Sequence, residues 1–167
     1  MDASTLRELQ APLKQRYKDD PATAATPLHA RGSTADDGVT FTVDGWGSPV
    51  RAGLHSATGG DGSDACSGDM LLEAVLGCAG VTLRSVATAM GLGLRSASGE
   101  ATGSFDARGT LGLDREVPVG VTDLRLVFTV DADADDAQLA KLAQLTERYC
   151  VVAKSLATPP VIEVVRA

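Results

Sequence analysis

The sequence predicts an α+β domain in which one long apolar helix separates two groups of β-strands. Residues 69–90 are apolar on almost every face of a helix, and on both sides of that segment hydrophobic residues alternate with a period of two. With 167 residues and 44% hydrophobic content, the chain fits one domain with its own core. We therefore expect a single domain over residues 1–167 in the order βββαββααβ, with residues 1–21 as an N-terminal helical extension.

The N-terminal extension is predicted to be an amphipathic helix over residues 5–18. Thr5 and Glu8 have the spacing of a capping box, in which each side chain bonds to the backbone of the other residue. Pro12 is expected to interrupt the helix, because proline lacks the N–H that a helix interior uses. The Asp-Asp-Pro sequence at 19–21 is expected to end it.

Three strands are predicted before the central segment, at residues 25–32, 39–43 and 50–54. The second is the clearest, because Val-Thr-Phe-Thr-Val alternates strictly and an Asp-Gly pair typical of a tight turn follows it. Residues 56–68 are rich in glycine, serine and aspartate and are expected to form a loop.

The central segment at 69–90 is predicted to be a helix about 33 Å long. Because it is apolar on nearly all faces, we expect it to be buried on all sides, and a second subunit is the simplest cover. The segment contains Glu73 and Arg84, and each charge costs about 3 kcal/mol at the centre of a bilayer. The sequence therefore favours a buried core helix and a homodimer over a membrane span.

The C-terminal half is predicted to return to strands and then to helices. Strands are expected at 95–107 and 121–131, followed by a helix at 134–149 whose acidic start suits the positive end of the helix dipole. A second short helix is expected from Cys150 to Leu156, and a last strand at 161–165.

The net charge of −7 and a pI near 4.7 argue against nucleic acid and anionic membranes as partners, since both attract basic surfaces. No basic stretch followed by an apolar run opens the sequence, so a cytoplasmic location is expected. His29 and His55 lack metal-ligand spacing, and the glycine-rich run at 59–62 lacks the Lys-Ser/Thr of a phosphate loop. We expect no metal and no cofactor.

The three cysteines, Cys66, Cys78 and Cys150, cannot complete a disulfide framework. Taken alone, Cys78 is typical of a small core residue in a buried helix. Cys150 lies at the junction of two predicted helices, where free backbone N–H groups can lower a thiol pKa. Cys66 lies in the predicted loop and is either an accessible thiol or a chance residue.

Two cysteine-containing segments resemble those of the OsmC/Ohr family. The run from Asp69 to Thr82, DMLLEAVLGCAGVT, resembles the family's central helix with its acidic-Leu-Leu-x-Ala-Leu-x-x-Cys pattern. The run from Glu147 to Leu156, ERYCVVAKSL, resembles the family's second cysteine segment, and the two cysteines are 72 residues apart. The resemblance covers most of residues 25–166. It implies an OsmC-like fold: an intertwined homodimer with long central helices between bent antiparallel sheets.

The resemblance also implies a thiol peroxidase that reduces organic hydroperoxides. Cys78 would be the peroxidatic thiolate and Cys150 the resolving cysteine. A positive charge from Arg31 or Arg51, held by the carboxylate of Asp69, would stabilise the thiolate. A small dithiol or a dihydrolipoyl protein would recycle the enzyme.

Two other functions remain open at this point. One is an OsmC-fold protein that binds or modifies another small electrophile or thiol without peroxidase turnover. The other is a dimeric binding module whose cysteines are merely buried. Cys66 is a candidate second resolving thiol.

Overall fold

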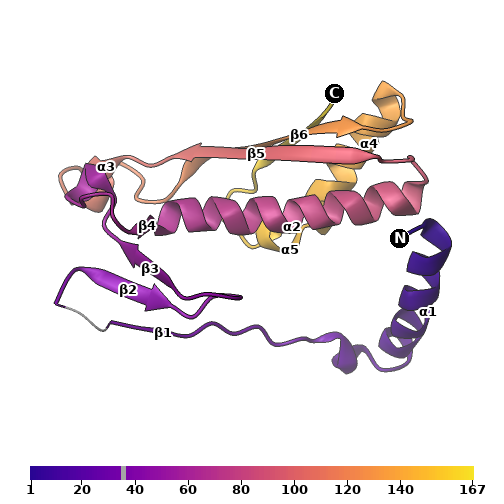
Figure 1. The fold of residues 1–167 in the computed structure, drawn as a ribbon, viewed down its shortest axis with the longest axis horizontal. Helices are drawn as coiled ribbons and strands as arrows, with labels where there is room; N and C mark the ends of the chain where they lie inside the picture. Colours follow the sequence, from indigo (N-terminus) through magenta and orange to yellow (C-terminus); the bar gives the residue numbers. More distant parts are fainter. Residues whose placement is uncertain (35–36) are drawn as a thin grey trace.

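The computed structural model describes residues 1–34 and 37–167 and confirms the α+β class. The chain runs from an N-terminal helix through a first sheet and a long central helix into a second sheet, with a helical pair inserted before the last strand of that sheet (Figure 1). The elements in chain order are α1 Ala3–Asp19, η1 Pro21–Ala24, β1 Gly32–Ser33, β2 Thr40–Val43, β3 Val50–Gly53, η2 Ser56–Thr58, β4 Ala65–Cys66, α2 Ser67–Met90, β5 Ser96–Ser104, α3 Ala107–Thr110, β6 Thr122–Asp131, α4 Asp136–Tyr149, α5 Val151–Lys154 and β7 Val161–Arg166.

The strands form two sheets, in the orders β1-β2-β3-β4 and β5-β6-β7. The expectation of purely antiparallel sheets is wrong, because β3 pairs with β4 and β6 pairs with β7 in parallel. A parallel neighbour needs a connection that returns the chain to the same end of the sheet. The helices α4 and α5 provide it between β6 and β7, and the segment containing η2 provides it between β3 and β4.

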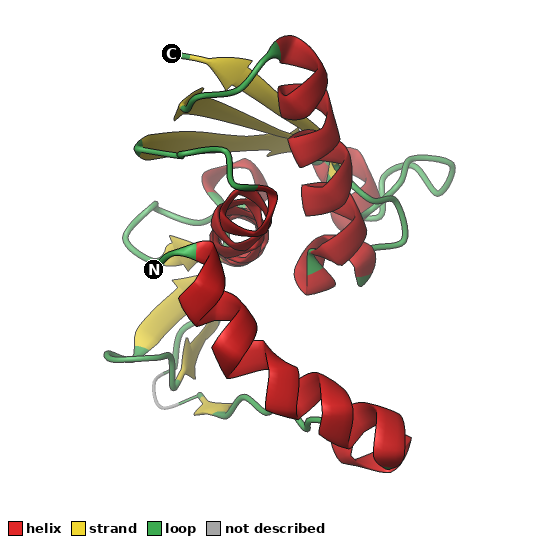
Figure 2. Cartoon of the chain, turned by 90° about the vertical axis from the view of Figure 1, so that its right-hand side faces the viewer, coloured by secondary structure: helices red, strands yellow, loops and turns green. Residues whose placement is uncertain are grey.

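The central helix α2 packs on β5 and on the helices α4 and α5. Figure 2 views α2 almost end on, with the second sheet on one side and α4 beside it. Its fully buried residues recur at every fourth position and so form one line along the helix, consisting of Val75, Ala79, Leu83 and Ala87. They meet a core from β6 and α4 that contains Leu126, Phe128, Val130, Leu139 and Leu142.

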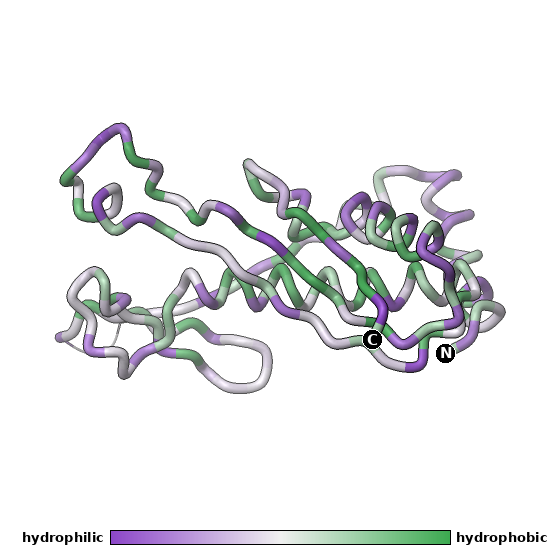
Figure 3. Tube along the Cα trace, turned by 90° about the horizontal axis from the view of Figure 1, so that it is seen from above, coloured by the Kyte–Doolittle hydropathy of each residue, from purple (hydrophilic) through white to green (hydrophobic). Residues whose placement is uncertain are grey.

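The expectation that α2 is buried on all sides is wrong for the single chain. Val81 is 74% exposed, and Ala74 and Gly77 are also exposed. By length and composition alone α2 is apolar enough to cross a membrane, a property that it shares with core helices of soluble proteins. Hydrophobic residues occur along much of its length in Figure 3, yet one small chain has only enough partner surface to cover one of its sides.

The N-terminal region differs from the prediction in three ways. Asp2 caps α1, because its carboxylate accepts the N–H of Thr5 at 2.8 Å. The predicted capping box between Thr5 and Glu8 is therefore wrong. Pro12 lies inside α1 without ending it. The strand expected at 25–32 is absent except for Gly32, because the residues before it are exposed and have no strand beside them to pair with.

The other boundaries agree within a few residues, and the structure adds four short elements, η1, η2, β4 and α3. The predicted loop at 56–68 contains η2 and β4 and ends where α2 begins, two residues earlier than expected. The short helix α3, which the sequence did not predict, starts after Asp106, whose carboxylate accepts the N–H of Arg108. The acidic start expected for α4 is a complete capping box between Asp135 and Gln138.

Replacement of Leu83 by alanine tests the buried line of α2. Leu83 is 1% exposed, and truncating a buried leucine lowers the free energy of unfolding by about 2 to 5 kcal/mol. Urea unfolding followed by circular dichroism measures the change. Leu113, which is 73% exposed in the segment after α3, is the matched control, and Leu113→Ala should leave the midpoint unchanged. Equal effects of the two variants would contradict this packing.

Candidate active site

The structure brings Cys78 and Cys150 together. Cys78 lies midway along α2 and is half-buried, whereas Cys150 is fully buried at the junction of α4 and α5. Because α5 packs on α2, the two thiols are near enough for Cys78 to raise the pKa of Cys150. The backbone around them is fixed by capping: Cys150 ends α4 and begins α5.

The surroundings of Cys150 raise the pKa of its thiol. Burial is the largest cause, because removing the thiolate from water penalises the charged form. The N–H of Ala153 lies 3.5 Å from Sγ and acts in the opposite direction, as the helix junction predicted, but it is outweighed. Interaction with Cys78 raises the pKa further. The environment of Cys150 therefore favours its neutral thiol over its thiolate.

The predicted charged partners do not reach Cys78 within one chain. Asp69 is exposed in the first turn of α2, nine residues before Cys78. Nine residues are about 13 Å of helix and about 180° of rotation, so the two side chains point in opposite directions. Arg31 is exposed just before β1, the outermost strand of the first sheet, which Figure 1 shows away from α2.

Arg51 has a carboxylate partner that the sequence analysis missed. Its guanidinium forms an ion pair with Asp64, whose side chain is only 13% exposed. Asp64 precedes β4, and β4 pairs with the strand that carries Arg51. Only the parallel pairing of β3 and β4 reveals this contact, so no local sequence signal indicated it.

Cys66 lies too far from Cys78 to resolve it within one chain. It caps the N-terminus of α2, twelve residues before Cys78, which is about 18 Å along the helix axis. A disulfide needs Cα atoms about 4.4 to 6.8 Å apart. Within residues 1–34 and 37–167, no group of three potential metal ligands is found.

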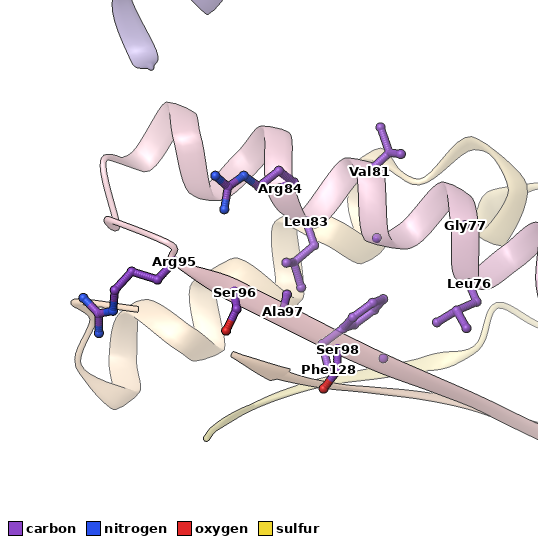
Figure 4. A pocket seen from close by; sticks show the side chains of 12 residues that line it. Leu76, Gly77, Val81, Leu83, Arg84, Arg95, Ser96, Ala97, Ser98 and Phe128 are labelled. Carbon is purple, nitrogen blue, oxygen red and sulfur yellow. The ribbon is translucent and has the colours of Figure 1, made fainter. Parts of the chain in front are cut away.

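A separate hollow of about 480 Å³ lies between α2 and β5 (Figure 4). Leu76, Leu83 and Phe128 line it, and Arg84 and Arg95 stand at one end. Both arginines already have structural partners: Arg84 donates to the carbonyl of Leu94, and Arg95 pairs with Asp131 at the end of β6 and with Asp133 just after it. Cys78 is not among the residues that line this hollow, although its helix neighbours Gly77 and Val81 are.

The raised pKa of Cys150 predicts a pH-dependent stability. The folded chain holds the Cys150 proton more tightly than the unfolded chain, whose thiol has the ordinary pKa of 9.0. This contribution to stability is therefore complete below pH 9.0 and falls as the pH rises through the raised pKa of the folded state. The free energy of unfolding should therefore fall more steeply above pH 9.0 in the native chain than in Cys150→Ala. Cys66→Ala, which removes a half-buried thiol, should retain the native slope. Identical slopes for the native chain and Cys150→Ala would refute the assignment.

Solved structures of known proteins share this architecture. An OsmC-like protein of unknown function from Vibrio cholerae gives a TM-score of 0.68 at 17% identity, over 84% of this chain and 100% of its own. An OsmC-like protein from Mycoplasma pneumoniae gives 0.65 at 14% identity, over 85% of this chain and 96% of its own. An organic hydroperoxide resistance protein OsmC from Legionella pneumophila gives 0.61 at 10% identity, over 86% and 99%. These likenesses concern the fold.

A comparison with sequence families agrees with the structural likeness. No curated protein matches the sequence. Residues 60–165 match the family described as OsmC-like protein. This region contains α2, the strands β4 and β5 on either side of it in the chain, and the segment around Cys150. The match extends over more than half of the chain and includes both cysteines of the interacting pair. The chain therefore belongs to the OsmC-like protein family.

Proposed function

We propose that the protein is a thiol peroxidase that reduces organic hydroperoxides at Cys78. The observation that carries the proposal is the proximity of a half-buried thiol on α2 to a fully buried thiol whose pKa that neighbour helps to raise. The two environments suit two different roles. A structurally similar protein from Legionella pneumophila is named an organic hydroperoxide resistance protein, which supports the same chemistry.

In the proposed reaction the Cys78 thiolate attacks the distal oxygen of the hydroperoxide. The O–O bond breaks, the alcohol leaves after taking a proton, and Cys78 becomes a sulfenic acid. The sulfur of Cys150 then attacks the sulfenic sulfur, water leaves, and a Cys78–Cys150 disulfide forms. A small dithiol or a lipoyl-type reductant restores both thiols. Such a cycle suits a reducing, cytoplasmic location.

The surroundings of Cys78 favour an organic substrate. Val81, three residues after Cys78, lies about 60° from it around α2 and is 74% exposed. Burying the apolar tail of a substrate contributes about 25 cal/mol per Å² of surface removed from water, a contribution that hydrogen peroxide cannot provide.

We further propose that a second copy of the chain completes the site in a homodimer. The exposed stripe of α2 formed by Ala74, Gly77 and Val81 lies beside Cys78, within about 100° of it around the helix. A partner that covers this stripe also approaches the thiol. Its Arg31 or Arg51, held by the carboxylate of its Asp69, would supply the positive charge that a thiolate needs.

The proposed roles predict different phenotypes for the two cysteines. Cys78→Ser should abolish consumption of cumene hydroperoxide in a stopped-flow assay, because the nucleophile is lost. Cys150→Ser should retain the first oxidation and then allow Cys78 to proceed to sulfinic acid, detected by mass spectrometry, because no resolving thiol is present. The native chain should react faster with cumene hydroperoxide than with hydrogen peroxide.

Cys66→Ser is the control for these variants and should keep full turnover. Turnover that survives Cys78→Ser, or a faster reaction with hydrogen peroxide, would refute the proposal.

The dimer is tested by sedimentation velocity at micromolar concentration. The native chain should sediment at twice the 17.1 kDa mass of one chain. Val81→Asp should shift the population towards monomer, since it places a charge in the proposed interface, and peroxide turnover should fall with it. Leu113→Asp places the same charge at a site of equal exposure outside α2 and should leave the dimer intact. A native monomer would contradict the proposal.

A further inference from the structure

A second thiol lies in a separate hollow at the N-terminal end of α2. A hollow of about 420 Å³ adjoins one of about 260 Å³. Both are lined by residues from four segments of the chain: His55, Cys66, Gly68, Phe105 and Val121. The larger hollow lies within the size range of small-ligand pockets, which begins at about 300 Å³, and the smaller one extends it.

The larger hollow has apolar walls that would suit a neutral ligand. Leu54, Leu71, Phe105 and Val119 line it, and none of its lining residues is an acid, an arginine or a lysine. The smaller hollow adds one carboxylate, Asp69. An anionic ligand would therefore meet repulsion and no compensating cation, whereas an apolar chain gains from burial against these walls.

The sulfur of Cys66 is available on the wall shared by both hollows. Cys66 occupies the N-cap position of α2, yet its side chain makes no capping hydrogen bond. Gly68 lies next to it, and a Cβ atom there would stand 3.4 Å from Sγ, so the absence of a side chain leaves space beside the sulfur. Cys66 is half-buried, which leaves the thiol accessible to a ligand in the hollow.

His55 contributes a hydrogen-bond donor to the same wall. The backbone N–H of Ala57 donates to Nδ1 of His55 at 3.0 Å. With Nδ1 acting as the acceptor, the neutral ring carries its proton on Nε2. An edge contact with Phe105, at 5.2 Å between ring centroids and 90° between the planes, holds the ring. His55 therefore places an N–H group in a hollow that also contains a thiol.

We propose that this hollow is a second thiol site, at which Cys66 adds to neutral α,β-unsaturated carbonyl compounds with an apolar chain. The sulfur forms a bond to the β-carbon and the C=C π bond breaks. The electron pair moves to the carbonyl oxygen as an enolate, which accepts the Nε2–H of His55. The proton released by the thiol returns to the α-carbon. The net reaction is an addition that needs no oxidant, reductant or third component.

This site is independent of the Cys78–Cys150 pair. Leu71, Leu72 and Gly68 place the hollow on a side of α2 different from the exposed stripe that contains Gly77 and Val81. A dimer formed through that stripe would leave the hollow accessible. Reaction at Cys66 therefore does not require peroxide chemistry at Cys78.

The test is the reaction of the full chain with trans-2-nonenal, followed by peptide mapping of each cysteine adduct. For each aldehyde, the rate constant of Cys66 is divided by that of N-acetylcysteine. This ratio should be about tenfold higher for nonenal than for acrolein, because acrolein has no tail to bury. Val121→Trp should fill the hollow and remove this preference while alkylation by iodoacetamide stays within a factor of about two. His55→Phe should slow the addition of nonenal more than alkylation by iodoacetamide.

A Cys78→Ser, Cys150→Ser double variant isolates Cys66 and separates this test from peroxidase turnover, and the native chain serves if that variant does not fold. The proposal would be overturned if the ratio of the Cys66 rate constant to that of N-acetylcysteine were the same for both aldehydes. So would a nonenal preference that survives Val121→Trp, or adducts confined to Cys78.

Discussion

The structure depends on the burial of one side of α2. A helix of 24 residues with apolar side chains nearly all round needs more cover than a chain of 167 residues supplies. The buried line from Val75 to Ala87 packs on the second sheet and on α4, and these elements cover only this side of the helix. The position of that line sets the exposure of the other α2 residues. Residues on the opposite side of the helix are exposed, and residues beside the line, at its margin, are half-buried.

Cys78 lies at that margin, and this explains how a single helix can position a reactive thiol. A cysteine on the buried line would be inert, and one on the exposed stripe would have no fixed neighbour. At the margin, Cys78 contacts α5 on one side and remains accessible on the other. The helix junction then brings the buried Cys150 to it, and burial keeps that second thiol protonated. Two identical functional groups thereby acquire different environments from packing alone.

The sequence predicted the elements whose pattern is local. The alternation at 39–43 and 121–131 and the apolar run at 69–90 correspond to β2, β6 and α2. It failed where the outcome depends on distant residues. The segment at 25–32 has strand-like composition, but only Gly32 finds a neighbouring strand. Pairing of β3 with β4 depends on a contact between residues far apart in the chain, and this pairing gives Arg51 its partner, Asp64.

The candidate site shows the same division. The two cysteine segments could be identified from their residues, and the structure places those cysteines near enough for Cys78 to raise the pKa of Cys150. The charged groups could not be placed, because spacing along a helix gives a rotation as well as a distance. Asp69 is nine residues from Cys78 and therefore faces away from it.

Cys150 and Cys66 lie in different surroundings, and these surroundings determine what each thiol can meet. Cys150 has no water and a thiol neighbour, so its chemistry depends on what Cys78 becomes. Cys66 has a hollow, an apolar wall and an N–H donor, so its chemistry depends on what enters from solvent. About 18 Å of rigid helix separates Cys66 from Cys78, and this distance prevents a direct exchange between them within one chain. The helix that builds the core therefore also keeps two thiol chemistries apart.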